Sequence, residues 1–196
     1  DVTDGKVLVD GVDVRDYKLS ALNNKLGYVP QRAVMFSGTV KSNVCFGENG
    51  KEKISNKKMR AAIKTAQGKD FVEKMDKEYD SHIAQGGTNV SGGQKQRLAI
   101  ARAVARDPEI FIFDDSFSAL DYTTDTALRH ALKTHTKDAT NLIVAQRIGT
   151  IMHADQILVL DKGKCVGKGT HQELMKNCKT YQQIALSQLT KEELNV

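Results

Sequence analysis

Residues 110–115 read Ile-Phe-Ile-Phe-Asp-Asp, an unbroken apolar run that ends in two carboxylates. A strand without alternating polar residues is typical of a parallel sheet that is buried on both faces. A second run of this type, Asn141 to Ala145, follows a segment from about Thr123 to Thr136 whose apolar spacing indicates a helix. Strand, helix and strand in this order predict a right-handed parallel crossover, and therefore an α/β fold.

Upstream of this unit the sequence predicts a hairpin and a further strand. Lys6 to Val9 and Val12 to Val14 flank the turn signal Asp10-Gly11. Leu26 to Val29 form another short apolar run, which Pro30 stops.

Between that strand and residue 110 the pattern is helical. From about Val40 to Asp76 the apolar residues are spaced for amphipathic helices. A glycine-rich link, Gln85 to Asn89, leads to Ser91-Gly92-Gly93-Gln94, where Ser and Gln three residues apart predict a capping box. We therefore expect a helical insert that is followed by one long amphipathic helix.

The last third of the chain predicts a second hairpin and two helices. Gln156 to Leu160 and Lys164 to Val166 flank a turn at Asp161-Lys162-Gly163. Thr170, with Glu three residues later, predicts a capped helix. The segment from Tyr181 to Leu194 is predicted to be a surface helix.

Composition and charge limit the class of protein. The chain has 196 residues, of which 40% are hydrophobic and 27% charged, as in soluble globular proteins with one core and at most an appended lobe. Its apolar runs are far shorter than the roughly 18–20 residues of a membrane-spanning helix. Lys and Arg number 29 and Asp and Glu 24, and the net charge of +5 favours a solvated basic face over a nucleic-acid groove.

The cysteines indicate the redox compartment of the chain, and its first residue indicates whether it is part of a longer sequence. Cys45, Cys165 and Cys178 are an odd number without metal-binding spacing, which indicates a reducing compartment. The chain starts at Asp1 rather than Met and shows no signal-peptide pattern, so we expect it to be a piece of something longer.

The Asp114-Asp115 pair is the first candidate site. It stands at the carboxyl end of a predicted buried strand, which is where ligands bind in open α/β sheets. One carboxylate there can hold Mg²⁺, and its neighbour can orient an attacking water. A solvated acidic turn after the strand is the alternative interpretation.

Two further positions carry groups suited to phosphate. The helix start at Ser91-Gly92-Gly93-Gln94 offers unpaired N–H groups, a partial positive charge and two glycines that let an anion approach the backbone. An ordinary glycine-containing helix start is the alternative. Gln146 follows the strand Asn141 to Ala145, so we expect it near Asp115, where its amide can hydrogen-bond a phosphate but cannot transfer a proton.

Together these motifs resemble the nucleotide-binding domain of ABC transporters, specifically that of an exporter-type half-transporter. The resemblance covers nearly the whole chain. It rests on Tyr28-Val29-Pro30-Gln31, similar to the Q-loop; Phe36 to Val40, similar to the exporter form of the region after it; Gln85-Gly86-Gly87, similar to the loop that meets the coupling helices; Val90 to Gln94, similar to the signature motif with Val90 in place of Leu; Ile110 to Asp115, similar to Walker B; Ser118 to Asp121, similar to the D-loop; and Ala145 to Ile148, similar to the switch loop.

The resemblance implies an α/β, P-loop NTPase-like ABC ATPase core, a mostly parallel sheet with flanking helices, plus a helical subdomain. Residues 1–36 and 91–180 would form the core, about 40–90 the helical subdomain with the signature motif at its end, and 181–196 a C-terminal helix. It also implies ATP and Mg²⁺ as cofactors. The implied site residues are Asp115, Gln146 and Gln31 as catalytic, Ser91, Gly92, Gly93, Gln94 and Asp121 as cofactor-binding, and Asp114 and Gln31 as metal-binding.

Partners and location follow from the same resemblance. It implies a second nucleotide-binding domain, the coupling helices of a transmembrane domain, and no nucleic acid. The chain would work on the cytoplasmic face of the cell membrane as part of an integral membrane transporter.

Three departures from the family pattern change the expected function. No Gly-x-x-x-x-Gly-Lys-Ser/Thr sequence occurs in the 196 residues, so the P-loop is missing, and we expect a domain truncated after it, without its N-terminal strand and helix. Asp115 stands where competent members have Glu, and a carboxylate misplaced by the shorter side chain can cost on the order of 100-fold in rate. Gln146 replaces the switch His.

The departures at Asp115 and Gln146, combined with a nearly intact signature motif, resemble the pattern of the degenerate half of a heterodimeric multidrug-exporter-like pair. Ser91 to Gln94 would complete the competent site of a non-identical partner. Asp114, Asp115, Gln31 and Gln146 would line a site that binds ATP and turns over slowly. Two alternatives stay open: a soluble ABC-type ATPase of DNA repair or translation and, for the isolated fragment, a non-catalytic interaction module.

Overall fold

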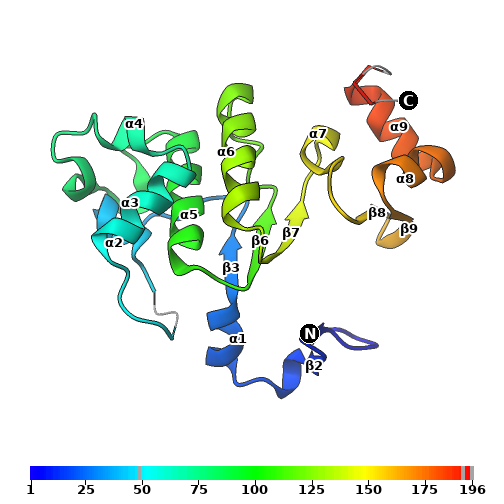
Figure 1. The fold of residues 1–196 in the computed structure, drawn as a ribbon, viewed down its shortest axis with the longest axis horizontal. Helices are drawn as coiled ribbons and strands as arrows, with labels where there is room; N and C mark the ends of the chain where they lie inside the picture. Colours follow the sequence, from blue (N-terminus) through cyan, green and yellow to red (C-terminus); the bar gives the residue numbers. More distant parts are fainter. Residues whose placement is uncertain (48–49, 191–192, 195–196) are drawn as a thin grey trace. The chain divides into compact units, whose positions relative to one another are not determined.

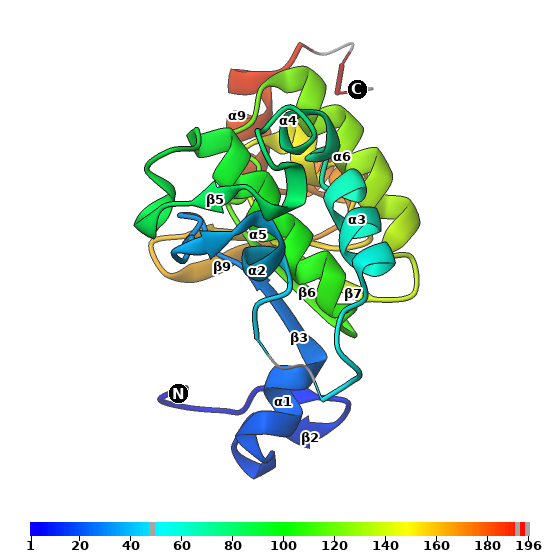
Figure 2. The ribbon, with the colours of Figure 1, turned by 90° about the vertical axis from the view of Figure 1, so that its left-hand side faces the viewer.

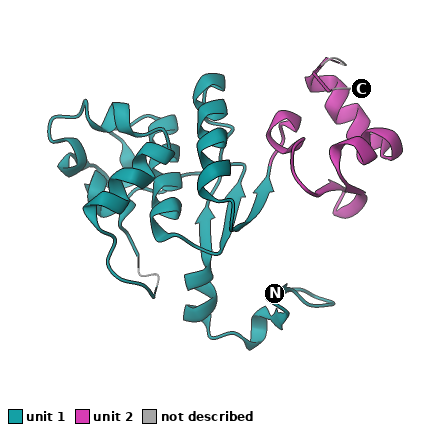
Figure 3. Cartoon of the chain, viewed as in Figure 1, with its two compact units in different colours: residues 1–144 teal, residues 145–196 magenta. Residues whose placement is uncertain are grey.

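The computed structural model describes residues 1–47, 50–190 and 193–194. The chain divides into two compact units, Asp1–Val144 and Ala145–Val196 (Figure 3). In the first unit the elements are β1 (Leu8–Val9), β2 (Val12–Asp13), α1 (Leu19–Lys25), β3 (Leu26–Val29), β4 (Gly38–Thr39), α2 (Val40–Val44), α3 (Asn56–Thr65), α4 (Lys69–Val72), β5 (His82–Ile83), α5 (Gly92–Arg106), β6 (Ile110–Asp114), α6 (Tyr122–His135) and β7 (Thr140–Val144). In the second unit they are α7 (Ile148–Ile151), β8 (Ile157–Asp161), β9 (Lys164–Gly169), α8 (His171–Asn177) and α9 (Lys179–Gln188).

A parallel sheet of order β3-β6-β7 forms the framework of the first unit (Figure 1). Tyr28 pairs with Ile112, and Ile112 pairs with Leu142, so the carboxyl ends of the three strands lie at one edge. The predicted crossover and the predicted strand Leu26–Val29 are confirmed. The last strand lies one residue earlier than predicted, at Thr140–Val144.

One face of this sheet carries the core of the first unit. Val29, Phe111 and Phe113 are almost completely buried, and they belong to the same hydrophobic cluster as Leu98 of α5 and Leu128 of α6. The rings of Phe111 and Phe113 stack with their centroids 5.7 Å apart. Burial of aromatic and aliphatic side chains between the sheet and these helices is the main source of stability for the fold.

The opposite face of the sheet is open, and the prediction of strands buried on both faces is wrong there. Tyr28, Leu142 and Val144 are 56, 53 and 50% exposed. The strand order 3-6-7 moves in one direction across the sheet, and right-handed crossovers that step in one direction place their helices on the same face. In the first unit, as far as the structure describes it, the apolar runs therefore pack against helices on one face.

The predicted helical insert between β3 and β6 is confirmed as α2, α3 and α4, which lie beside α5 (Figure 2). Met59, Ala62 and Ile63 of α3 are buried in the same cluster as the sheet residues. This packing puts the helical segment and the strands in one compact unit. The observed division falls after Val144, whereas the sequence-based division separated residues of about 40–90.

The N-terminal hairpin is confirmed. β1 pairs antiparallel with β2. Its turn residues Asp10 and Gly11 have φ values of 49° and 78°, the left-handed pair that a tight hairpin turn of this twist requires.

The three cysteines are free thiols: Cys165 is exposed, Cys45 partly buried and Cys178 buried. None of the helices within the described residues has the length and apolar composition of a membrane span.

The second unit contains the predicted hairpin and capped helix. β8 and β9 pair antiparallel around a turn in which Lys162 and Gly163 have φ values of 46° and 76°. α8 begins with a complete capping box between Thr170 and Glu173.

The C-terminal helix differs from the prediction for Tyr181 to Leu194. α9 begins at Lys179 and ends at Gln188, and residues 191–192 and 195–196 lie outside the described part of the chain. Tyr181 and Ala185 are buried in the core of the second unit, so one face of α9 packs inward as in other surface helices. Its Tyr181 hydroxyl lies 2.8 Å from Nδ1 of the buried His171.

Candidate functional site

β6 carries two carboxylates to the carboxyl edge of the sheet. Asp114 is the last residue of the strand. Asp115 follows it, and its N–H donates to the Val144 carbonyl at 2.9 Å. Asp115 has a φ of 43°, a left-handed conformation in which the chain leaves the strand. The carboxylates stand at the edge where parallel sheets bind ligands.

Two side chains from the end of β3 and the residues after it reach these carboxylates. The Tyr28 hydroxyl donates to Asp114 Oδ2 at 3.0 Å, and Gln31 Nε2 donates to Asp115 Oδ2 at 3.2 Å. The hydrogen bond to Asp114 raises the pKa of Tyr28, because loss of the hydroxyl proton would place two negative charges side by side. The structure thus brings together three of the residues singled out in the sequence, Gln31, Asp114 and Asp115.

The backbone before Gln31 is held by two further side chains. Gln96 of α5, which is 2% exposed, donates through Nε2 to the Pro30 carbonyl at 3.1 Å. Ser116, which is fully buried, donates through Oγ to the Val29 carbonyl at 2.8 Å. Buried polar groups are costly unless they are hydrogen-bonded, so these contacts fix the segment 28–31 between β6 and α5.

The residue types at this edge suit a magnesium ion. Mg²⁺ binds oxygen ligands, usually one or two carboxylates together with water and substrate phosphates. Within the residues that the structure describes, no group of three or more His, Cys, Asp and Glu side chains could hold a metal ion. Asp114, Asp115 and the amide oxygen of Gln31 fit an ion that shares its ligands with the phosphates of a nucleotide.

A second cluster lies at the start of α5. The Ser91 side chain accepts from the Gln94 N–H at 3.2 Å, and the Gln94 side chain accepts from the Ser91 N–H at 2.9 Å, which confirms the predicted capping box. No atom lies within 4 Å of a Cβ built at Gly92. A Cβ built at Gly93 would lie 3.4 Å from the Ala119 carbonyl oxygen, so residues 118–121 pack beside this helix start. The exposed backbone at Gly92 is open to an anion.

Asp121 has a structural partner of its own. Its side chain caps α6 by accepting from the Thr124 N–H at 2.9 Å. This hydrogen bond, more than any other contact, lowers the pKa of the Asp121 carboxyl, with a smaller contribution from the positive charge of Arg97. Asp121 is therefore ionised and oriented beside the start of α5.

The loop Gln85–Gly87 lies against the segment after Gln31. β4 pairs with β5, which brings Gly38–Thr39 next to His82–Ile83. The Ser37 N–H donates to Gln85 Oε1 at 3.3 Å, and the Gly86 N–H donates to the Met35 carbonyl at 3.1 Å. Two motifs that are about 50 residues apart in the chain thus form one surface.

Gln146, expected near Asp115, belongs to the second unit. Its carbonyl accepts from Gln188 Nε2 of α9 at 2.8 Å. The Gln188 Oε1 in turn accepts from the Ile148 N–H at 2.9 Å, so one side chain ties the residues after β7 to α9.

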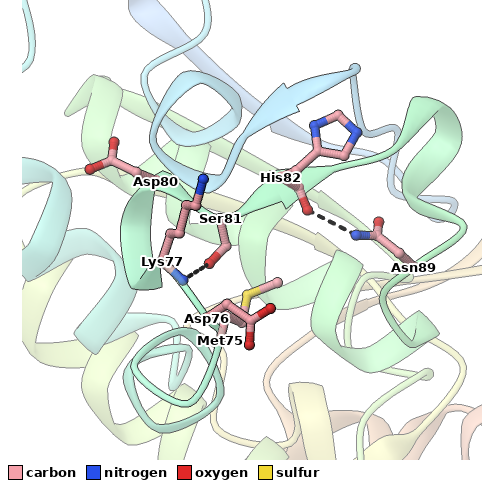
Figure 4. A pocket seen from close by; sticks show the side chains of 7 residues that line it. All are labelled: Met75, Asp76, Lys77, Asp80, Ser81, His82 and Asn89. Atoms are coloured by element: carbon pink, nitrogen blue, oxygen red, sulfur yellow. Dashed lines mark hydrogen bonds between the residues drawn. The ribbon is translucent and has the colours of Figure 1, made fainter.

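One hollow of the first unit is separate from the carboxylates. It has a volume of about 460 Å³ and lies between α4 and α5, where Lys77 N–H donates to Ser81 Oγ and Asn89 Nδ2 donates to the His82 carbonyl (Figure 4). Its lining also includes Met75, Asp76 and Asp80. None of the site residues predicted from the sequence lines it.

The sequence did not single out Tyr28, Gln96 or Ser116 as functional. Their partners are 86, 66 and 87 residues away along the chain. A signal existed for two of them: Tyr28 stands inside the Q-loop-like motif, and Gln96 stands two residues after Gln94 in the signature-like tract.

Comparison with known proteins gives consistent matches. A family model described as ABC transporter matches residues 1–118. The chain is 47% identical over 188 residues to an uncharacterized ABC transporter ATP-binding protein of Mycobacterium tuberculosis, covering 96% of this chain and 32% of that protein. It is 41% identical over 184 residues to the ATP-dependent lipid A-core flippase of Sodalis glossinidius, covering 94% and 31%.

A solved structure shares the fold. A bacterial Atm1-family ABC exporter with ATP bound superposes with a TM-score of 0.88 at 34% identity, covering 94% of this chain and 32% of that one. The chain thus spans about a third of the length of the proteins that it matches.

Proposed function

This chain belongs to the ABC transporter family, and from that premise we propose that it is the ATP-binding domain that powers export of a substrate by a membrane transporter. The observation that carries the proposal is the edge of the β3-β6-β7 sheet, where Gln31, Asp114 and Asp115 meet. Two carboxylates and an amide in this position suit a magnesium–nucleotide complex. When bound, the ion would neutralise phosphate charge.

The matched proteins favour a transporter over a soluble ATPase of DNA repair or translation. The three proteins named above each match at least 94% of this chain, and they include a lipid A-core flippase and an exporter with ATP bound. The contacts between Gln85–Gly87 and the segment after Gln31 support the same choice. A transmembrane partner that contacts this surface would respond to nucleotide binding at the site.

We propose an asymmetric division of labour with a second, non-identical nucleotide-binding domain. Ser91, Gly92, Gly93 and Gln94 present an open helix start that would meet the phosphates held by the partner. Asp115, with a shorter side chain than Glu, would leave this chain's own site able to bind ATP and slow to hydrolyse it. Gln146 cannot transfer a proton, so it would not replace the switch His in catalysis. The assembly would act on the cytoplasmic face of the cell membrane.

The test compares both clusters in the assembled transporter. Gly92→Asp adds a negative charge at the proposed phosphate contact, and we expect it to reduce ATP hydrolysis by the pair on the order of 100-fold or more. Ser91→Arg should act similarly. Asp115→Ala should reduce it by less than about tenfold, because the partner's site carries most of the turnover. Steady-state phosphate release measures all three.

Asn56→Asp is the matched control. Asn56, like Gly92, is the first residue of a helix that follows a capping serine, and it is exposed at the start of α3. We expect the control variant to hydrolyse ATP like the unmodified protein. Equal losses from Gly92→Asp and Asp115→Ala would contradict the asymmetric division, and full activity of Gly92→Asp would contradict the role of the signature residues.

A further inference from the structure

We infer that Tyr28 is a positioning residue whose hydroxyl holds the Asp114 carboxylate in one orientation toward a divalent cation. The inference rests on the proposed function, because it takes Asp114 as a ligand of the magnesium ion that accompanies ATP. It adds a residue that supports that ligand from the neighbouring strand.

The register of the sheet places the two side chains diagonally. Tyr28 pairs with Ile112 in the parallel ladder, and Asp114 lies two residues further along the same strand, so both side chains point to the same face. From this position the Tyr28 hydroxyl reaches Asp114 Oδ2 at 3.0 Å.

Burial does not account for a tyrosine at this position. Tyr28 is 56% exposed, on the open face of the sheet, whereas Val29 beside it is fully buried in the core. An exposed ring gains little from packing, and Phe would supply the same ring. What the hydroxyl adds is the hydrogen bond to Asp114.

A neutral donor suits the support of a metal ligand. The phenol occupies one lone pair of Oδ2 and leaves Oδ1 and the remaining lone pair available to a cation. It brings no positive charge that would repel the cation, as Lys or Arg would. Gln31 supports Asp115 in the same way, with a neutral amide that donates to Oδ2 at 3.2 Å. Each carboxylate thus has a neutral donor from the chain around β3, and outer groups of this kind orient metal ligands.

The experiment measures Mn²⁺ binding to the assembled transporter with ATP present, by electron paramagnetic resonance, with Tyr28→Phe in this chain as the test variant. We expect the dissociation constant for Mn²⁺ to rise by roughly tenfold, the lower end of the range for loss of an outer hydrogen bond, because the site is partly exposed. The number of ions bound at saturation and the thermal unfolding midpoint should not change. A misfolded variant would change both.

Tyr17→Phe is the matched control. The Tyr17 hydroxyl donates at the same distance, 3.0 Å, to the Val9 carbonyl in the N-terminal hairpin. Tyr17→Phe removes a hydroxyl in the same unit, but that hydroxyl has no carboxylate partner. The Tyr17→Phe variant should therefore bind Mn²⁺ like the unmodified protein. Weakening by both variants, or an unchanged or lower dissociation constant for Tyr28→Phe, would overturn the inference.

Asp114→Asn separates this inference from the proposed function. If Asp114→Asn weakens Mn²⁺ binding and Tyr28→Phe does not, the inference alone fails. If Asp114→Asn binds like the unmodified protein, or the unmodified protein binds no Mn²⁺ with ATP present, Asp114 is not a ligand and both fail.

Discussion

Asp115 occupies a backbone conformation that few side chains tolerate. Its φ of 43° lies in the left-handed region, which costs about 1–2 kcal/mol for an ordinary residue and less for Asp or Asn, whose short polar side chains form local hydrogen bonds. The Asp115 carbonyl also accepts from Ser118 Oγ at 2.9 Å, which fixes the turn. The backbone at this position therefore favours Asp over the Glu of the family pattern.

We expect Asp115→Glu to lower the free energy of unfolding by about 1 kcal/mol. The longer side chain is less able to form the local hydrogen bonds that offset the cost of the left-handed conformation. Asp115→Asn keeps a short side chain that can still accept from Gln31, so it should change this free energy little. Urea unfolding followed by circular dichroism measures both variants. Equal stability of the two would show that the backbone at residue 115 relaxes without cost.

The sequence predicted Gln31, Asp114 and Asp115 as candidate site residues because their types and spacing follow a family pattern. It could not predict the contacts of Tyr28 and Gln96, because those depend on strand register and on which turn of α5 faces Pro30. Such contacts join residues more than 60 positions apart, and no local pattern encodes them.

Among the helices and strands, locally encoded features were predictable. The capping boxes at Ser91–Gln94 and Thr170–Glu173 each involve four consecutive residues, so the residue types alone were sufficient to predict them. The exposure of β7 was not predictable from its apolar residues, because burial depends on where α5 and α6 lie.

The capping box of α8 should make that helix sensitive to acid. Hydrogen bonds from Thr170, chiefly from its N–H, lower the pKa of Glu173 below its ordinary value of 4.5. A carboxyl whose pKa is lower in the folded than in the unfolded protein stabilises the folded state at pH values above its unfolded-state pKa. This stabilisation is lost as the pH falls through the folded-state pKa. Protection of the α8 amides should therefore decrease below about pH 4.5.

Glu173→Gln tests this directly by hydrogen exchange measured by NMR. Gln keeps an oxygen that can accept from the Thr170 N–H, but it does not titrate. We expect the variant to lose the part of the acid dependence that belongs to α8. If α8 in both proteins shows the same pH profile, another group controls the effect.

In the whole molecule, the open face of the β3-β6-β7 sheet is the largest departure from the expected core. Tyr28 of β3 and Leu142 and Val144 of β7 expose about half of their surface on this face, and the partly buried Ile112 of β6 lies between the two strands. Contiguous exposed apolar surface of this kind is unusual in a soluble protein and binds apolar molecules.

The chain should therefore bind a hydrophobic dye such as anilinonaphthalene sulfonate on this face. Leu142→Ser together with Val144→Thr should lower the fluorescence of the bound dye by about half or more. Leu19→Ser is the control, because Leu19 is 72% exposed but lies in α1, outside the sheet. If the control lowers the fluorescence as much as the double variant, the dye binds elsewhere.

The fold class was predictable from the sequence as a whole, since the strand–helix–strand pattern specifies a parallel crossover. The division after Val144 was not predictable. The grouping of α3 with the sheet depends on the core that they share through Met59 and Ile63, and an amphipathic pattern does not specify its partner.

The pairing of β3 has a consequence for synthesis on the ribosome. Among the strands described, β3 pairs with β6 alone, and Gln31 and Asp115 are 84 residues apart. At about 5–20 residues per second, the ribosome needs roughly 4–17 s to make the intervening chain. During that interval the apolar residues of β3 are unpaired in the nascent chain. Slow codons between these positions would prolong its dependence on chaperones.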